Sequence, residues 1–339
     1  MRNRAIIAAG LCCLLAACSS PQAVPEPRYG DQPQEILTQE QFAAIAEQAA
    51  AGIAAATTSN SADQLGGRIA GPMRDERTGQ LRLKAILGDS YQLDPIVISK
   101  ESTPVLSGTG FPRTAMTVEK PADGQNLTSL TVWTQDSPRT NYALWAQVQL
   151  FPGVNVPKIV SQLDNEVGDI SNPSAYAANP NDVLATYALY NASRTQQAIK
   201  FQDGDPLFTQ IAAQQDSFGQ ALGRSGSATT QFAPGDKGIR AVHTDDGGLI
   251  IVGELNYVVE ITRTQRNAKV RIADQIGALY TGNKDNAVLE IADKAVAHYS
   301  TTVAFYIPPA GAASAVVQVI GSAKPTLVAV ENVGANPAH

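Results

Sequence analysis

Histidine is the side chain most often used for proton transfer at neutral pH, and it is also a common zinc ligand. The chain has three histidines, His243, His298 and His339, which lie in separate parts of the sequence. No Gly-x-Ser-x-Gly, Ser-x-x-Lys or His-x-x-x-His motif accompanies them. The histidines therefore indicate neither a serine hydrolase nor a metal site. We expect His243, beside a predicted hairpin turn, to be an exposed strand residue.

Two segments place paired carboxylates beside glycine, at Asp203-Gly204-Asp205 and at Asp245-Asp246-Gly247-Gly248. Calcium accepts such ligands, but neither segment has the spacing of the twelve-residue calcium loop. Aspartate in a turn or at a helix N-cap accepts hydrogen bonds from nearby backbone N–H groups. We therefore expect a turn and a helix cap at these positions, and calcium binding is the alternative. We expect no cofactor.

A local basic cluster follows the first predicted helix. It consists of Arg68, Arg74, Arg77, Arg82 and Lys84, opposed by Asp75 and Glu76. A solvated face explains such a cluster, and the alternative is contact with anionic lipid headgroups or an acidic envelope polymer. A phosphate-binding loop is not indicated, because the glycines of residues 66–72 follow a helix and not a strand.

The three cysteines, Cys12, Cys13 and Cys18, all lie near the N-terminus. Arg2 and Arg4 precede an uncharged apolar stretch over residues 5–17, which is typical of a secretory signal. The stretch ends Leu15-Ala16-Ala17-Cys18 and resembles the bacterial lipobox. The resemblance implies removal of residues 1–17 and lipidation of Cys18, whose acyl chains anchor the protein to a membrane.

The segment after Cys18 is rich in proline and poor in apolar residues, so we expect residues 18–36 to form a tether. Sixteen extended residues at about 3.1 Å each span up to ~50 Å. Removal of residues 1–17 leaves no thiol, which excludes a disulfide, a cysteine nucleophile and a thiolate metal site.

The composition is that of a globular protein, with 44% hydrophobic and 17% charged residues. A length of 339 residues allows about two domains at roughly 150 residues each. The formal net charge of −6 gives no sign of nucleic-acid binding, which usually needs a basic domain.

Three helices are predicted from caps and apolar spacing, over residues 38–56, 182–190 and 206–222. Thr38 and Gln41 fit a capping box, and Asp205 precedes a proline that can occupy the first turn. The first and third helices share Phe-x-x-Ile-Ala, at residues 42–46 and 208–212. A duplicated helix-plus-sheet unit and two unrelated amphipathic helices both explain this match.

Alternating apolar residues predict antiparallel strands, joined by short turns, at residues 93–99, 114–119, 130–135, 142–151, 239–244, 249–262, 299–307, 315–320 and 326–330. We expect Trp133 and Trp145 to pack as neighbours across two of these strands, and Gly253 to mark a bulge. Residues 269–297 fit either a strand leading into a helix or one irregular helix.

These elements predict an α+β fold of two helix-on-antiparallel-sheet halves. The expected organisation is a signal peptide (1–17), the lipidated Cys18 and tether (18–36), a first domain (37–160), a connecting helical segment (161–205), a second domain (206–333) and a flexible C-terminus (334–339).

Several segments together resemble an uncharacterised family of actinobacterial surface lipoproteins. They are the lipobox, the first helix and residues 68–72, 248–251, 280–282 and 305–311. The resemblance implies a location on the outer face of the plasma membrane. A long helix before a curved sheet is also similar to the cone-shaped folds of nuclear-transport-factor-2 and cystatin, a likeness that fixes no function.

The anchor and the absence of a catalytic motif favour a non-catalytic binding or scaffolding module of the bacterial envelope. Its expected partners are the membrane, through Cys18, and an envelope protein, lipid or glycan. The alternative is a hydrolase or transferase that acts on envelope polymers through carboxylates. Such an enzyme would bring two acids within about 5–10 Å of each other in one cleft.

Overall fold

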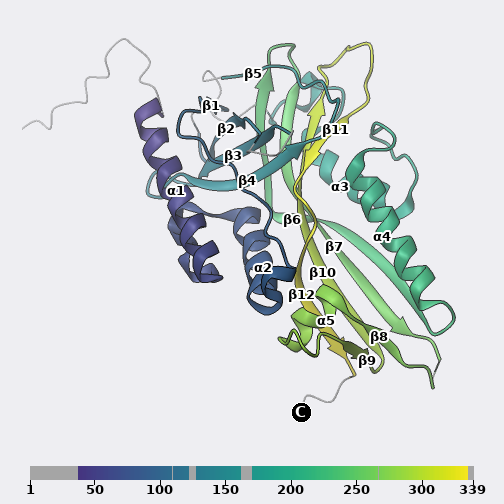
Figure 1. The fold of residues 1–339 in the computed structure, drawn as a ribbon. Helices are drawn as coiled ribbons and strands as arrows, with labels where there is room; N and C mark the ends of the chain where they lie inside the picture. The colour runs from purple at the N-terminus through teal and green to yellow at the C-terminus, as the bar shows by residue number, and fades with distance from the viewer. Residues whose placement is uncertain (1–36, 109, 122–126, 162–169, 266, 335–339) are drawn as a thin grey trace, which may run out of the picture. The chain divides into compact units, whose positions relative to one another are not determined.

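The computed structural model describes residues 37–108, 110–121, 127–161, 170–265 and 267–334 (Figure 1). The predicted signal peptide (1–17), Cys18, the predicted tether and residues 335–339 lie outside this part. From Leu37 onward the described residues belong to one compact unit. Helices and a large antiparallel sheet together confirm the predicted α+β class. The duplication and the cone-shaped likeness stay predictions.

The α-helices of the described part are α1 (Gln39–Ser59), α2 (Gly71–Leu87), α3 (Pro180–Ser193), α4 (Pro206–Leu222) and α5 (Asp274–Thr281), and short 3-10 helices are η1 (Ala62–Arg68), η2 (Gly88–Ser90) and η3 (Pro173–Ala175). The strands are β1 (Val105–Leu106), β2 (Arg113–Glu119), β3 (Ser129–Gln135), β4 (Ala143–Leu150), β5 (Ile159–Val160), β6 (Gly226–Thr244), β7 (Leu249–Arg263), β8 (Val270–Ile272), β9 (Leu289–Ile291), β10 (Lys294–Ile307), β11 (Gln318–Ser322) and β12 (Thr326–Val333).

One sheet runs through both halves of the chain, in the order β1-β2-β3-β4-β11-β10-β7-β6-β5. The seam between early and late strands is the antiparallel pair of β4 and β11, in which Leu150 lies opposite Gly321. The predicted division into domains 37–160 and 206–333 is therefore not a division of the structure. Backbone pairing across the seam makes the two ranges parts of one unit.

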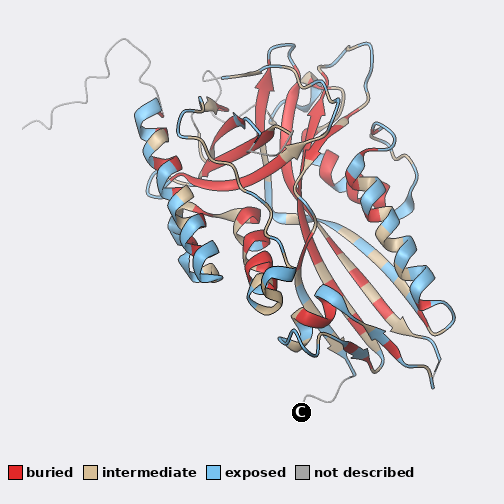
Figure 2. Cartoon of the chain, viewed as in Figure 1, coloured by how far each residue is buried: buried red, intermediate tan, exposed pale blue. Residues whose placement is uncertain are grey.

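The sheet curls until its two edges meet. The backbone N–H of Leu106 in β1 donates to the side-chain oxygen of Ser161, just after β5, over 3.2 Å. Apolar side chains from β2, β3, β4, β6, β7, β10 and β11 form one buried cluster on the concave face, including Met116, Val132, Ile250, Ala304 and Ile320. These strands are among the most buried elements (Figure 2).

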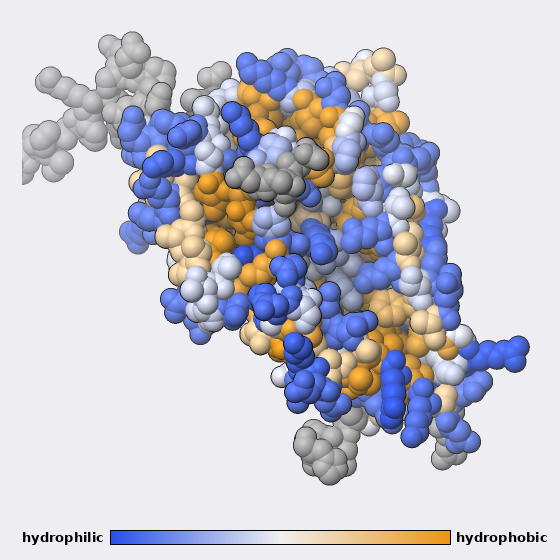
Figure 3. Space-filling model, in the orientation of Figure 1, coloured by the Kyte–Doolittle hydropathy of each residue, from blue (hydrophilic) through white to orange (hydrophobic). Residues whose placement is uncertain are grey.

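Helices α1 and α3 pack against the opposite face of the sheet. Phe42 of α1 packs edge-on against Trp133 of β3, with ring centroids 5.3 Å apart. Tyr187 of α3 contacts Phe201 and Phe305 in the same way, at 5.2 and 5.1 Å. On the face shown in Figure 3, hydrophilic residues predominate and apolar residues show in separate patches.

The three predicted helices are confirmed with their caps. Thr38 and Gln41 form the expected capping box at the start of α1. Asp205 accepts a hydrogen bond from the N–H of Phe208 at 2.8 Å and so caps α4. Residues 269–297 resolve into strand β8, which leads into helix α5. Helix α2 was not predicted, because its inward-facing positions include Glu76, Arg77 and Gln80 instead of an unbroken apolar stripe.

The predicted strand at residues 93–99 is wrong, because this segment is extended but joins no strand ladder. Pro95 has no N–H to offer, and the side chain of Gln147 takes the place of a neighbouring strand. Gln147 accepts from the N–H of Val97 at 2.9 Å and donates to its carbonyl oxygen at 2.6 Å. Each of the other predicted strands overlaps an observed one, although β4 is one residue shorter at each end, β6 and β10 begin earlier and β11 begins later than expected.

Trp133 and Trp145 are both buried, which confirms the packing role, but they do not pair across the strands. A register shift places Leu144 opposite Trp133. Trp145 belongs to the concave-face cluster and lies under the guanidinium of Arg240, 4.7 Å from its ring centroid. The irregularity expected at Gly253 is present at that position of the ladder, because Pro234 lies opposite Leu255 and Ile239 lies opposite Gly253, and the extra residues are in β6.

Trp145 also fixes the start of α2. Gly71 has a φ of +55°, and a Cβ atom added there would lie 2.4 Å from the indole ring of Trp145. We expect Gly71→Ala to lower the free energy of unfolding by about 2–4 kcal/mol, through a left-handed backbone and overpacking. Urea denaturation measures this loss. The control is Gly67→Ala, where nothing lies within 4 Å of the added atom. Equal losses in both variants would contradict the expectation.

Candidate functional site

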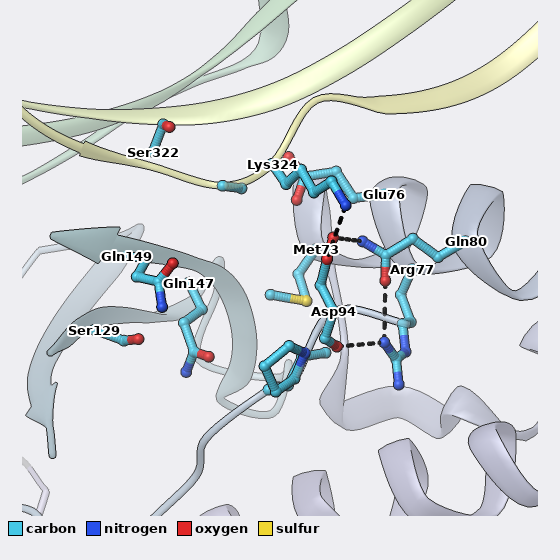
Figure 4. A pocket seen from close by; sticks show the side chains of 13 residues that line it. Met73, Glu76, Arg77, Gln80, Asp94, Ser129, Gln147, Gln149, Ser322 and Lys324 are labelled. Carbon is cyan, nitrogen blue, oxygen red and sulfur yellow. Dashed lines mark hydrogen bonds and ion pairs between the residues drawn. The ribbon is translucent and has the colours of Figure 1, made fainter. Parts of the chain in front are cut away.

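A cavity of about 240 Å³ lies beside α2 (Figure 4). We call it the α2 pocket. It is bounded by α2, by the extended segment at residues 94–96, by strands β3 and β4, and by the connection from β11 to β12. The polar side chains that line it include Glu76, Arg77, Gln80, Asp94, Gln147 and Lys324. Segments far apart in the sequence thus meet around one polar cavity.

Gly79 brings α2 close enough to β12 to form this pocket. A Cβ atom at this position would lie 2.9 Å from the carbonyl oxygen of Leu327 and 3.0 Å from a methyl group of Thr326. Such distances are shorter than normal packing contacts, so glycine is required for the approach. The close contact places Gln80 within 3.3 Å of the Thr326 hydroxyl, measured from Nε2 to Oγ1.

Arg77 is the most constrained charged group of the pocket, with only 4% of its surface exposed. Its guanidinium donates to Gln80 Oε1 at 3.0 Å, to the carbonyl oxygen of Asp94 at 2.9 Å and to Thr57 Oγ1 at 2.9 Å. Nε is buried and has no hydrogen-bond partner among the described residues. Burial lowers the pKa of Arg77, and the nearby Asp94 carboxylate raises it in part.

Asp94 lies beside Arg77, and its carboxylate is held between two donors. Gln80 Nε2 donates to Oδ2 at 2.9 Å, and Lys324 Nζ lies 3.7 Å from Oδ1. Burial raises the pKa of Asp94, while the charges of Lys324 and Arg77 lower it. Figure 4 shows these contacts as a chain that runs from Lys324 through Asp94 and Gln80 to Arg77.

Glu76 is buried where α2 contacts β10. Thr302 Oγ1 donates to Glu76 Oε1 at 2.7 Å. Burial raises the carboxyl pKa to about 8, although the hydrogen bond from Thr302 opposes this shift, and the carboxylates of Glu254, Asp94 and Asp75 add to it. Glu76 therefore keeps its proton at neutral pH and is a neutral group in the pocket.

A second cavity of about 410 Å³ lies on the other side of α2, between that helix and the face formed by β7 and β10. Glu254 lines it and accepts from Ser300 Oγ at 2.8 Å, and burial raises its pKa. Lys237 lies between Asp236 and Asp75, at 2.8 and 3.7 Å. The acids of this cavity are thus paired with donors of the protein.

The side chains of the predicted basic patch do not lie together in the structure. Arg68 donates to Gln48 and to the carbonyl oxygen of Tyr142, and Arg74 donates to the carbonyl oxygens of Ile69 and Gly66. Arg77 enters the α2 pocket, Arg82 lines the second cavity, and Lys84 faces Asp89 at 3.4 Å. Helical spacing turns these side chains to different sides, so only Arg77 joins a candidate site.

Both predicted acidic segments are turns and caps, as expected. Asp205 accepts from Tyr187 Oη at 2.9 Å besides capping α4. Asp246 accepts from Thr244 Oγ1 at 2.6 Å, from the N–H of Gly248 at 3.1 Å and from the Tyr306 hydroxyl. Within the described residues no three histidine, cysteine or acidic side chains are grouped so that they could hold a metal ion.

The histidines take no part in the α2 pocket. His243 is buried and lies 3.4 Å from the Tyr176 hydroxyl through Nδ1, so the expectation of an exposed histidine is wrong. Strand β6 turns this residue toward the segment that carries Tyr176. His298 lines the second cavity beside Glu331, with 3.2 Å between Nε2 and Oε1. His339 lies outside the described residues.

Sequence reasoning missed Gln80, Asp94, Gln147 and Lys324 as site residues. The usable signal was Gly71-Pro72, since proline in the first turn is typical of a helix start. A helix from that point puts residues 76, 77 and 80 on one side. The partners of these residues lie 14 or more positions away, so their identity depends on the tertiary fold.

Replacing Glu76 with glutamine tests whether the buried Glu76 carboxyl has a raised pKa in the folded protein. The folded pKa of about 8 exceeds the ordinary value of 4.5, so the neutral group stabilises the fold fully below pH 4.5, and this contribution is lost as the pH rises through 8. Between pH 4.5 and 8 we expect the free energy of unfolding of the unsubstituted protein to fall by up to about 1.4 kcal/mol per pH unit because of Glu76. Glu76→Gln should not show this fall. Denaturation at several pH values measures the difference.

The matched control is Glu47→Gln, because Glu47 is an exposed acid paired with Lys100 at 2.7 Å. The control should keep the pH profile of the unsubstituted protein. Parallel profiles for the unsubstituted protein and Glu76→Gln would show that the buried carboxyl carries no raised pKa.

No helix of the described part is long and apolar enough to cross a membrane. Neither a protein-family model, nor a curated protein, nor a solved structure matches the chain. Function is therefore inferred from the groups that line the α2 pocket and from the N-terminal sequence.

Proposed function

We propose that this protein is a lipid-anchored binding module of the bacterial envelope, which holds a small polar ligand in the α2 pocket without catalysis. The N-terminal sequence supports the anchor, because residues 1–18 have the order of charged, apolar and small residues before cysteine that a lipoprotein signal requires. The polar lining of the α2 pocket supports the binding role.

One observation carries the binding role: a buried arginine that lines the cavity has a donor without a partner among the described residues. A buried polar group without a hydrogen bond costs about 1–3 kcal/mol, so proteins rarely retain one without a use. Nε of Arg77 is such a group, and the residue lines the α2 pocket. A ligand that accepts this hydrogen bond would recover the cost.

The pocket is also held in shape before any ligand arrives. Gln147 fixes residues 96–98 against the sheet, Gln80 bridges Asp94 and Thr326, and Thr302 holds Glu76. Side chains that are fixed by a second layer of hydrogen bonds lose little freedom on binding. The proposed partners are this ligand and the membrane, through Cys18, with the tether between them.

A carboxylate-based hydrolase or transferase that acts on envelope polymers is the second candidate. The observation in its favour is that Glu76, protonated at neutral pH, and Asp94 line one cavity, as a general acid and its partner would. Against it, Asp94 is already engaged by Gln80 and Lys324. Cleavage of an envelope polymer that Glu76→Gln abolishes would favour this candidate.

The anchor is tested by Cys18→Ala. We expect this variant to leave the membrane fraction or to accumulate as an unprocessed precursor, because the acceptor of the lipid is gone. Cell fractionation and the intact mass measure both outcomes. Cys13→Ala is the control, since Cys13 lies inside the segment to be removed, and it should leave processing unchanged. A processed Cys18→Ala chain that stays in the membrane would contradict the anchor.

The binding role is tested by native mass spectrometry of the protein purified from its own membranes in mild detergent. We expect a discrete added mass on the lipidated chain, which disappears in a denaturing spectrum of the same sample. A chain that always carries its lipid and nothing else would count against a stably bound ligand.

A further inference from the structure

We infer that the ligand of the α2 pocket carries an oxyanion, a carboxylate or a phosphate group, which contacts Arg77 and Lys324. The inference rests on the proposed function that this pocket binds a ligand. It adds the chemical class of that ligand, and it follows from how the charges of the pocket are placed.

The first argument is the environment of Arg77. Its three hydrogen-bond acceptors are an amide oxygen, a backbone carbonyl oxygen and a hydroxyl, all of them neutral groups. No carboxylate of the described residues forms an ion pair with it, although 96% of its surface is buried. The Asp94 carboxylate is close enough to raise the pKa of Arg77 but does not outweigh its burial, and an anion in the pocket would lower the remaining cost of the buried charge.

The second argument is the balance of charge around the cavity. Arg77 and Lys324 supply two cationic groups, and Asp94 supplies one anionic group. Glu76, the other acid of the lining, is neutral at pH 7 because burial raises its pKa to about 8. The pocket therefore has an excess positive charge, which an anionic ligand neutralises.

The third argument is the freedom of Lys324. Its ammonium group lies 3.7 Å from Asp94 Oδ1, which is longer than a hydrogen bond, and 66% of its side chain is exposed. It stands on the β11–β12 connection, and Figure 4 shows its side chain beside Glu76 and Asp94. A small movement would let it contact an anion that also meets Arg77, so the two cations can hold one ligand together.

The size and the remaining lining limit the rest of the ligand. A volume of about 240 Å³ corresponds to about eight water molecules at ~30 Å³ each, which is room for a molecule the size of one sugar ring. Ser129, Gln149 and Ser322 add hydroxyl and amide groups to the wall. These groups suit a hydroxylated acid or a phosphate better than an apolar acid.

Isothermal titration calorimetry on the full lipidated chain in detergent tests the inference with glucuronate, inorganic phosphate and glucose. We expect glucuronate or phosphate to bind at least about tenfold more tightly than glucose, with an affinity that falls as salt is added. Binding of glucuronate alone would identify a carboxylate ligand, and binding of phosphate alone would identify a phosphate ligand.

Lys324→Gln provides the matched test of the site, because this exposed side chain can change without loss of the fold. We expect it to weaken binding of the anion about tenfold. Lys100→Gln, which removes another exposed lysine outside the pocket, should leave binding unchanged.

Three results would overturn the inference. If glucose binds as tightly as the anions, or if Lys324→Gln has no effect on anion binding, the pocket selects its ligand by other chemistry, while its binding role stands. If none of the three compounds binds, the anion assignment fails. The native mass spectrum then still tests the proposed function independently, because it shows whether any ligand stays bound to the protein.

Discussion

The close packing of α2 against the sheet is the constraint on which the candidate site depends. Gly71 and Gly79 permit this packing, the first at the ring of Trp145 and the second at the backbone of β12. A helix that lies so near a sheet normally presents apolar residues to it. Here three of the buried positions are Glu76, Arg77 and Gln80, so each needs a polar partner that the rest of the fold must supply.

Those partners come from four separate parts of the chain. Thr302 lies on β10, Thr326 begins β12, Asp94 lies on the extended segment and Thr57 on α1. The network satisfies most of the buried groups but leaves Nε of Arg77 without an acceptor. A half-satisfied buried network is unfavourable in a purely structural core. This imbalance is the physical basis for assigning the pocket a ligand and for giving that ligand a negative charge.

Local signals predicted the elements well where the sequence follows the ordinary rules of caps and alternation. The capping box of Thr38 and the cap of Asp205 located two helices, and alternation located most strands of the sheet. Prediction failed where buried polar contacts change the pattern. Helix α2 carries polar residues on its buried face, and residues 93–99 pair with the side chain of Gln147 instead of a strand. Contacts between residues 14 to 246 positions apart leave no local trace in the sequence.

The pairing of β4 with β11 joins early and late parts of the chain, and this determines the order in which the parts of the α2 pocket can assemble. Gln80 and Thr326 are separated by 246 positions, and Glu76 and Thr302 by 226. Contacts of such long range form late, because a long loop must close before they can form. On a chain that emerges N-terminus first, α2 exists before the strands that complete its pocket. A chain that still lacks its last strands therefore has helix α2 but not the pocket beside it, and the pocket is complete only when β12 is in place.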